Sequence, residues 1–264
     1  MPPSALERLP EILDGLRRRR PALFLDYDGT LTPIVSRPEE AILDEAARRA
    51  VAALARLCPV AVVSGRDLAD VRRRVGLEGI WYAGSHGFDL AGPGGAARVH
   101  PGGPAALPDL DLAEREMREA LAGVEGALVE RKRFALAAHY RLVAAGDRAQ
   151  VERAVDRALS HYPGLRRTAG KMVLELLPGA LWDKGSAVRW LLEALGLAGA
   201  GVVPIYLGDD LTDEDAFREL AESGIGIAVL EAPRPTAARY QLHSPAEVRH
   251  LLDELAAALE GPSG

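Results

Sequence analysis

Polar residues stand at the ends of several short apolar runs of this chain, and their types could support chemistry. They are Asp26, Asp28, Ser64 and the neighbouring pair Asp209 and Asp210, and Lys184 opens a predicted helix further along. Carboxylates that gather in one place repel one another strongly unless a cation lies among them. Hard oxygen ligands of this kind suit Mg²⁺, which often bridges to a phosphate group. These residue types therefore predict a magnesium-dependent site for phosphoryl transfer.

Each of these residues has a part that it could take in such a reaction. Asp26 could act as a nucleophile on phosphorus. Asp28, two residues further on in a tight turn, could serve as general acid and base. Ser64 and Lys184 could hold phosphate oxygens and neutralise charge in the transition state.

The same residues also have a purely structural interpretation. An Asp at a strand end is often only a turn former or a helix cap. The segment 212–215 could be a capped helix start with acidic groups in its first turn, and 64–66 could be an ordinary turn. The chemical interpretation gains weight because four such features follow in order, each at the end of a predicted strand or the start of a predicted helix.

The elements that must position these residues alternate along the chain. Short continuous apolar runs predict buried parallel strands at 22–25, 59–63, 80–83, 202–207 and 225–230. Helical spacing of apolar residues predicts helices at 38–57, 183–196 and 245–259, the last with a capping box. This alternation predicts an α/β fold, a Rossmann-like doubly wound parallel sheet that binds its ligand beyond the carboxyl ends of the strands.

The middle of the chain has a different pattern. A hairpin is expected at 88–99, and then helices at 110–123 and 147–161 and strands at 127–132, 134–142, 165–168 and 171–177. The order αββαββ predicts an antiparallel sheet with both helices on one face. We therefore expect residues 106–178 to form an inserted α+β domain, and 1–105 with 179–264 to form the core.

Polar residues recur with a period of two in the predicted strands of the insert. The pairs that would share a face are Glu130 and Lys132, Lys171 and Glu175, and His139 and Arg141. Carboxylates and ammonium groups on an open sheet face suit sugar hydroxyls, which both donate and accept hydrogen bonds. A solvated face with cross-strand ion pairs is the alternative, and the residues alone favour it.

Composition narrows the possible partners. The 264 residues carry a net charge of −6, which argues against a nucleic-acid or membrane partner. The one cysteine, Cys58, excludes an internal disulfide framework, and the N-terminal segment lacks the apolar stretch of a signal peptide. We expect a soluble cytoplasmic monomer with a small-molecule partner.

Four motifs of the predicted core resemble those of the haloacid dehalogenase superfamily of phosphotransferases. They read DYDGT, VVSGR, DKG and GDDLTDEDAF in chain order. The resemblance implies an aspartyl-phosphate intermediate on Asp26, with Asp28 as acid and base. It also implies that Asp26, the Asp28 carbonyl and Asp209 hold Mg²⁺, with Asp210 and Asp213 as supporting groups; which of Asp209 and Asp210 is the main ligand stays open.

Three further segments resemble the trehalose-6-phosphate phosphatases of that superfamily. They read AGSHG (83–87), VERKRFALAAHYR (129–141) and GKMVLELLP (170–178). In this family the insert is a cap that selects the substrate. The resemblance implies the substrate-binding residues Thr30, Gly65, Arg66, His86, Gly87, Glu130, Lys132, Arg141, Lys171 and Glu175.

The expected function is thus hydrolysis of trehalose 6-phosphate to trehalose and phosphate. The alternatives are a phosphatase of another sugar phosphate, such as sucrose 6-phosphate or a glycosyl-phosphoglycerate, and a non-catalytic sugar-phosphate sensor. All three lysines of the chain, Lys132, Lys171 and Lys184, fall at predicted ligand positions, whereas the other 29 basic residues are Arg. A compact ammonium and a planar guanidinium are not equivalent in a pocket, so we expect Lys132 to be a ligand group.

Overall fold

The computed structural model describes residues 1–199 and 201–261, which divide into two compact units. The first unit comprises Met1–Ala97 and Trp182–Gly264, and the second comprises Arg98–Leu181. The second unit begins earlier than residue 106, where the sequence placed the start of the insert. Within the described ranges every helix is too short or too polar to cross a membrane.

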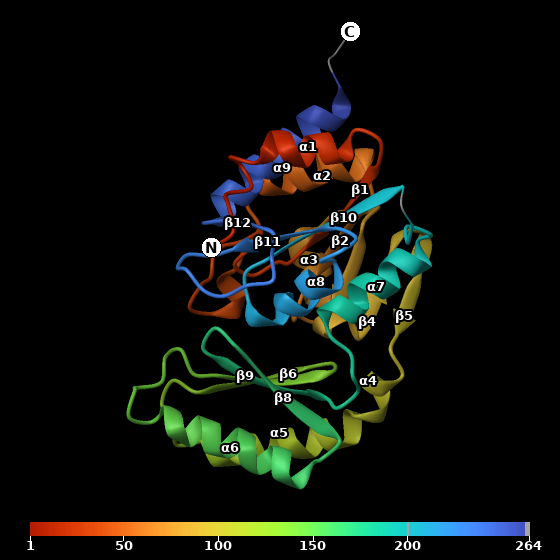
Figure 1. The fold of residues 1–264 in the computed structure, drawn as a ribbon. Helices are drawn as coiled ribbons and strands as arrows, with labels where there is room; N and C mark the ends of the chain where they lie inside the picture. Colours follow the sequence, from red (N-terminus) through yellow and green to blue (C-terminus); the bar gives the residue numbers. More distant parts are fainter. Residues whose placement is uncertain (200, 262–264) are drawn as a thin grey trace. The chain divides into compact units, whose positions relative to one another are not determined.

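The first unit is built on an eight-stranded sheet with the strand order β12-β11-β10-β1-β2-β3-β4-β5 (Figure 1). Its strands are β1 (Arg20–Leu25), β2 (Val60–Val63), β3 (Trp81–Gly84), β4 (Asp89–Ala91), β5 (Ala97–Val99), β10 (Val202–Gly208), β11 (Ile225–Val229) and β12 (Tyr240–Leu242). The central strand β1 pairs in parallel with both β10 and β2. The chain leaves β1 toward β2 on one side and reaches β10 on the other, so β1 lies at the point where the strand order reverses, which is where such sheets bind ligands.

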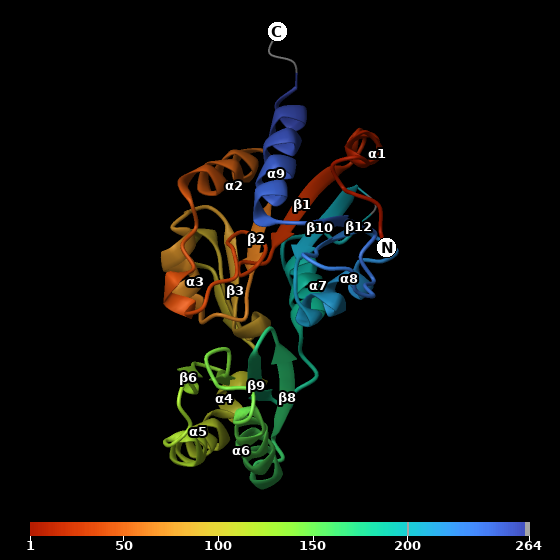
Figure 2. The same cartoon turned by 90° about the vertical axis from the view of Figure 1, so that its left-hand side faces the viewer.

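Helices cover both faces of this sheet (Figure 2). One face packs against α1 (Leu9–Leu16), α2 (Glu45–Leu57), α3 (Leu68–Val75) and α9 (Pro245–Glu260). The other face packs against α7 (Lys184–Ala194) and α8 (Glu214–Glu219). Apart from the exposed Arg20 at the start of β1, the residues of β1, β2 and β11 are apolar and buried, as expected for strands covered on both faces.

The helix starts follow local capping chemistry. Asp44 accepts a hydrogen bond from the Ala47 amide at 2.7 Å and so starts α2 at Glu45, later than the expected start at residue 38. Residues Pro38–Glu40 form a separate 3₁₀ turn, η1. Ser244 caps α9, but Glu247 accepts from the amide of His243, so the expected capping box is only half formed.

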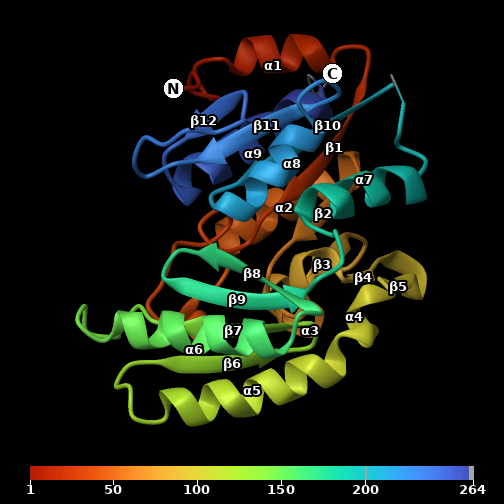
Figure 3. The ribbon, with the colours of Figure 1, turned by 60° about the horizontal axis from the view of Figure 1, so that its bottom comes forward.

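The second unit is an antiparallel sheet with two helices on one face (Figures 1 and 3). After a short turn of helix, α4 (Gly102–Ala105), its elements are α5 (Leu107–Leu121), β6 (Leu128–Lys132), β7 (Ala135–His139), α6 (Arg148–His161), β8 (Leu165–Gly170) and β9 (Val173–Pro178). The sheet order is β6-β7-β9-β8, and its apolar side chains pack on α5 and α6.

The predicted α/β class with a parallel sheet is confirmed, as is the αββαββ order of elements in the second unit. The helix start considered for 212–215 is present as the short 3₁₀ turn η4 (Leu211–Asp213) followed by α8. Strand β12, with only three residues, carries no prediction. Elements of this length show too few apolar repeats for a periodicity to be recognised.

Candidate active site

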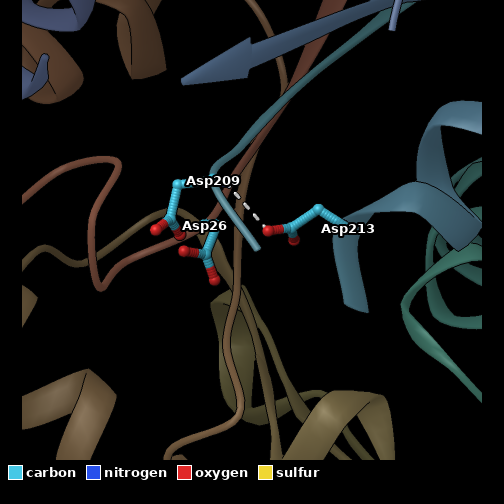
Figure 4. Close-up of side chains that lie close together, drawn as sticks. All are labelled: Asp26, Asp209 and Asp213. Carbon is cyan, nitrogen blue, oxygen red and sulfur yellow. Dashed lines mark hydrogen bonds between the residues drawn. The ribbon is translucent and has the colours of Figure 1, made fainter. Parts of the chain in front are cut away.

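The first residue after β1, Asp26, marks the centre of the candidate site. Its amide donates to the Leu207 carbonyl of β10 at 2.9 Å, which continues the strand pairing by one residue. The residue is only 4 % exposed, and its side chain lies beside Asp209, which follows β10 (Figure 4). The parallel register therefore brings together two carboxylates that are far apart in sequence.

Lys184, the first residue of α7, supplies the positive charge next to Asp26. Its ammonium donates to Asp26 Oδ1 and to Asp213 Oδ1, both at 2.7 Å, and the residue is buried. The preceding residue, Asp183, caps α7 by accepting from the Ser186 amide. The helix start thus fixes the direction from which the lysine enters the site.

Asp213 accepts hydrogen bonds through both of its oxygens. Oδ1 accepts from the Tyr206 hydroxyl at 2.6 Å as well as from Lys184. Oδ2 accepts from the amides of Asp209 and Asp210, at 3.0 and 2.9 Å. Since these donors already occupy both oxygens, Asp213 serves to hold Lys184 and the chain after β10 in place.

Burial and charge shift the protonation equilibria of this buried pair. Burial lowers the pKa of the Lys184 ammonium, but the carboxylates of Asp213 and Asp26 outweigh this effect and the net pKa lies well above its ordinary value. Burial raises the pKa of Asp26 well above its usual value; Lys184 opposes this shift, while Asp213 and Asp209 add to it. Removing the excess negative charge would thus favour the ionised, nucleophilic form of Asp26.

The donor set fits a hard divalent cation. Asp26, Asp209 and Asp213 can each offer a carboxylate oxygen, and these atoms lie within 4.8 Å of one another. Lys184 donates to Asp26 and Asp213, and the charge of Asp209 acts on Asp26 in addition, so negative charge gathers here. All donors are oxygens, as Mg²⁺ prefers.

The Asp209 carboxylate lies directly against the backbone of Gly29. Gly29 has φ +84°, and a Cβ at this position would overlap the Asp209 carboxylate. This close approach requires glycine both for its backbone conformation and for its lack of a side chain. Asp210 is oriented differently, because its side chain accepts from the Leu211 amide at 2.7 Å and caps the following turn.

Asp28 is held by the guanidinium of Arg66. Both Asp28 oxygens accept from Arg66, each at 2.7 Å, in a bidentate pair. Arg66 is held in turn by Asp70 at 2.9 Å and by the Pro38 carbonyl at 2.8 Å, and it lies over the Tyr27 ring.

The remaining predicted residues of the first unit lie after β2 and β3. The buried Ser64 hydroxyl accepts from the Arg66 amide at 3.1 Å, and the Ser64 carbonyl accepts from His86 N at 3.0 Å. His86 has φ +56°, unusual for a residue with a Cβ, and its ring packs on Gly65, where a Cβ would approach it to 2.8 Å. The hydroxyl of Thr30 is buried and has no hydrogen-bond partner among the residues that the structure describes.

Gly87, which follows His86, makes a close contact within the same unit. It has φ +94°, and a Cβ there would overlap the side chain of Ala187 on α7. The turn at 85–87 therefore packs against the helix that carries Lys184. This contact allows no side chain at residue 87.

In the second unit, polar residues pair across the sheet face opposite the helices. Lys132 on β6 donates to Glu175 Oε1 on β9 at 2.5 Å, and both residues are buried. The strand between them contributes the small residues Ala135 and Ala137, which pair in register with Lys132 and Glu175. His139 Nε2 lies 2.7 Å from Glu130 Oε2 on the same face.

Two predicted residues of this unit lie outside the strands. β7 ends at His139 and β9 begins at Val173, so Arg141 and Lys171 lie in turns and not on strand faces as expected. Lys171 belongs to the two-residue connection between β8 and β9, in which Met172 has φ +65°. Arg141 donates to the Lys171 carbonyl at 2.8 Å, so the two turns contact each other.

Three residues that support the site are absent from the prediction. They are Tyr206, Glu214 and Arg234. A Tyr inside an apolar strand is a weak signal that its hydroxyl needs a buried partner. The Arg234–Glu214 pair joins residues 20 positions apart, and no local pattern predicts it.

The fold and the carboxylates at its strand ends define an α/β protein of haloacid dehalogenase type. A haloacid dehalogenase-like hydrolase from Bacteroides thetaiotaomicron shares the fold, with a TM-score of 0.61 at 16% identity over 90% of this chain and 99% of that chain. At this identity the likeness concerns the fold alone.

Closer similarities identify the family. The sequence profile of the trehalose-phosphatases matches residues 24–246, so the chain belongs to the trehalose-phosphatase family. A trehalose-phosphate phosphatase from Mycobacterium marinum is 48% identical over 261 residues, which are 97% of this chain and 66% of that protein. The C-terminal domain of trehalose-6-phosphate phosphatase from C. albicans has a TM-score of 0.85 at 26% identity, over 97% of this chain and 99% of that domain.

The family resemblance predicted from the motifs is thereby confirmed. The chain spans 66% of the Mycobacterium marinum relative, and only 20% of other mycobacterial relatives that it matches at the same identity.

Proposed function

We propose that this chain is a phosphatase that hydrolyses trehalose 6-phosphate to trehalose and inorganic phosphate. The observation that carries the proposal is the buried contact of Asp26 with Lys184, next to Asp209, in a chain whose family match runs over residues 24–246. A carboxylate nucleophile needs a nearby cation and a water-poor site, and this arrangement supports both.

In the first step, Asp26 attacks phosphorus and the bond from phosphorus to the sugar oxygen breaks. Asp28 gives a proton to the leaving oxygen. Because both oxygens of Asp28 accept from Arg66 in the structure, Asp28 can do so only once it carries a proton and at least one of these bonds is exchanged for a bond to the substrate. The product of this step is trehalose, with the phosphoryl group on Asp26.

In the second step, Asp28 takes a proton from a water molecule as that water attacks phosphorus. Phosphate is released and the Asp26 carboxylate is regenerated. Lys184 stays in contact with Asp26 throughout and offsets negative charge on the phosphoryl oxygens. Ser64, whose buried hydroxyl follows β2, would donate to a phosphate oxygen.

The residues proposed to hold Mg²⁺ are the carboxylates of Asp26 and Asp209 and the carbonyl of Asp28. Asp209 is favoured over Asp210 because it belongs to the carboxylate cluster, whereas Asp210 caps the next turn. Asp213 is a supporting group, since its oxygens already accept from Lys184, Tyr206 and two amides. A bound Mg²⁺ would balance the charge of the carboxylates and of the phosphate.

We propose that the second unit is the substrate-specificity cap and that its polar sheet face selects the sugar. Glu130, Lys132 and Glu175 present charged groups on the same face as the small Ala135 and Ala137 of the middle strand. Hydroxyl groups can both donate to the carboxylates and accept from the ammonium. The turn residues Arg141 and Lys171 would contribute at the rim of this face.

A panel of phosphate esters tests the substrate. Phosphate release is measured with Mg²⁺ for trehalose 6-phosphate, sucrose 6-phosphate, glucose 6-phosphate and a glycosyl-phosphoglycerate, with Asp26→Asn as the inactive control. The proposal predicts the highest kcat/KM for trehalose 6-phosphate. A higher value for another member of the panel would reassign the sugar, and activity equal to that of the control would reject the phosphatase.

A further inference from the structure

A loop outside the four motifs contacts the backbone of the candidate metal site. The loop follows β11, and its Arg234 stands between Pro233 and Pro235, which restrict the local backbone. One terminal nitrogen of Arg234 donates to the carbonyls of Asp209 and Asp210, at 3.4 and 3.2 Å. These carbonyls belong to the residues that leave β10 and carry the proposed metal ligand.

The other terminal nitrogen of Arg234 is held by Glu214. It donates to Glu214 Oε1 at 2.6 Å and also approaches the Pro235 carbonyl at 3.3 Å. Glu214 is buried, and its Oε2 accepts from the Ala237 amide at 2.8 Å. Glu214 starts α8 directly after Asp213, so this one carboxylate ties the loop to the helix that follows the metal-site residues.

The segment from Asp209 to Asp210 is therefore fixed from two sides. Asp213 accepts from the amides of both residues, and Arg234 donates to the carbonyls of both. Amide and carbonyl contacts together leave a peptide segment little freedom to rotate. The direction of the Asp209 carboxylate depends on that rotation, because the side chain is short.

We propose that Arg234 is a positioning residue for the divalent cation, which acts by fixing the backbone of Asp209 and Asp210 and not by touching the cation or the substrate. The inference rests on the proposed metal-dependent function. Groups that orient metal ligands typically change metal affinity by about 10-fold to 100-fold when they are removed. We therefore expect the loss of Arg234 to weaken Mg²⁺ binding while leaving the recognition of the sugar unchanged.

The experiment measures Mg²⁺ binding to the full chain by titration calorimetry, without substrate. Arg234→Gln should raise the Mg²⁺ dissociation constant by about tenfold, and Arg234→Lys should fall between it and the unchanged protein. The matched control is Arg218→Gln, which removes an exposed arginine that pairs with Asp215 on α8. The control should bind Mg²⁺ like the unchanged protein.

A kinetic measurement separates positioning from general destabilisation. At saturating Mg²⁺, the KM for trehalose 6-phosphate of Arg234→Gln should equal that of the unchanged protein, whereas the Mg²⁺ concentration for half-maximal rate should rise by about tenfold. If Arg234→Gln does not fold, the same Mg²⁺ measurements are made on Glu214→Gln. This variant keeps an acceptor for the Ala237 amide and loses the charge that holds Arg234.

Equal Mg²⁺ affinities in the unchanged protein, Arg234→Gln and Glu214→Gln would overturn the inference. An unchanged protein that binds Mg²⁺ but does not hydrolyse trehalose 6-phosphate would contradict the proposed function, while weaker binding by Arg234→Gln would still support the inference. An unchanged protein that binds no Mg²⁺ would reject the inference together with the proposed metal.

Discussion

Carboxylates and lysines gather at two places in this protein, and the two places balance their charge differently. After β1 and β10, Asp26, Asp209 and Asp213 lie close together, and Lys184 donates to Asp26 and Asp213. On the sheet of the second unit, Lys132 donates to Glu175, and His139 Nε2 lies 2.7 Å from Glu130 Oε2. The first arrangement gathers negative charge that a further cation would offset, whereas the second spreads hydrogen-bonding groups over a sheet face and suits a neutral polyol.

The comparison assigns separate tasks to the two places. Changes in the first unit should lower the rate for every phosphate ester, because they affect the phosphoryl group. Changes on the polar face of the second unit should act on trehalose 6-phosphate and leave small esters unaffected. The following changes test this separation, from the largest expected effect to the smallest.

Asp26→Asn should abolish the reaction. The amide keeps the shape of the side chain but is not a nucleophile, so we expect kcat to fall by at least ~10⁴-fold for trehalose 6-phosphate and p-nitrophenyl phosphate alike. Phosphate release in a steady-state assay measures both. If Asp26→Asn loses activity toward one of these substrates and keeps activity toward the other, the two units do not have separate tasks.

Gly29→Ala should lower kcat by about 100-fold, because its Cβ would overlap the Asp209 carboxylate and displace it. The matched control is Gly79→Ala. Gly79 has φ +82°, almost the same as the +84° of Gly29, but a Cβ there meets no atom within 4 Å. Both variants bear the backbone strain, so equal losses of activity would show that the contact with Asp209 is irrelevant.

Lys132→Arg should raise the KM for trehalose 6-phosphate by about tenfold, which corresponds to one hydrogen bond to a charged group. The Lys132 ammonium lies 2.5 Å from Glu175, and a planar guanidinium is broader than an ammonium and places its donors differently. The kinetics with p-nitrophenyl phosphate should not change. The control is Arg133→Lys, which alters an exposed residue that lies over the Phe134 ring.

An unchanged KM in Lys132→Arg would mean that the surviving lysine has no role in sugar recognition. An equal rise in KM for p-nitrophenyl phosphate would place its effect on the phosphoryl group instead. Either outcome would remove the contrast between the two units.

The smallest expected effect concerns the pH dependence of stability. Burial raises the pKa of Asp26 above its value in the unfolded chain, so the folded state holds that proton more tightly. The contribution of Asp26 to stability is therefore greatest at low pH and falls as the pH rises through the unfolded and then the folded pKa. Bound Mg²⁺ should reverse this loss, because it favours the ionised carboxylate.

We thus expect Mg²⁺ to raise the Tm more at pH 7.5 than at pH 5. Mg²⁺ at 100 times its dissociation constant stabilises the folded protein by about 2.7 kcal/mol. A change of this size is measurable by thermal unfolding. In Asp26→Asn the dependence of this Mg²⁺ effect on pH should be weaker. A shift that is larger at pH 5 would contradict the direction of the Asp26 pKa.

The sequence predicted the parts of this arrangement that depend on strand ends. Asp26 and Asp209 follow apolar runs, and the parallel pairing of β1 with β10 brings them together. The alternation of Glu130 and Lys132 likewise predicted that they share a face of β6. Such positions follow from local periodicity, which sequence patterns report well.

Contacts between distant segments could not be predicted in this way. The bidentate pair of Arg66 with Asp28 and the bonds of Arg234 to the Asp209 and Asp210 carbonyls depend on how loops pack. The sequence predicts Lys171 in a strand at 171–177, but the tight connection at Met172 takes it out of the sheet.

The kcat/KM ratio of trehalose 6-phosphate to glucose 6-phosphate, measured in the unchanged protein and in Lys132→Met, tests the central claim most directly. Glucose 6-phosphate offers the same phosphoryl group without the second sugar ring. The account predicts a ratio of at least ~100 in the unchanged protein, about the discrimination available from two lost hydrogen bonds to charged groups. In Lys132→Met the ratio should fall by about tenfold with kcat/KM for glucose 6-phosphate unchanged. A ratio near 1 in the unchanged protein, or an equal loss for both substrates in the variant, would contradict it.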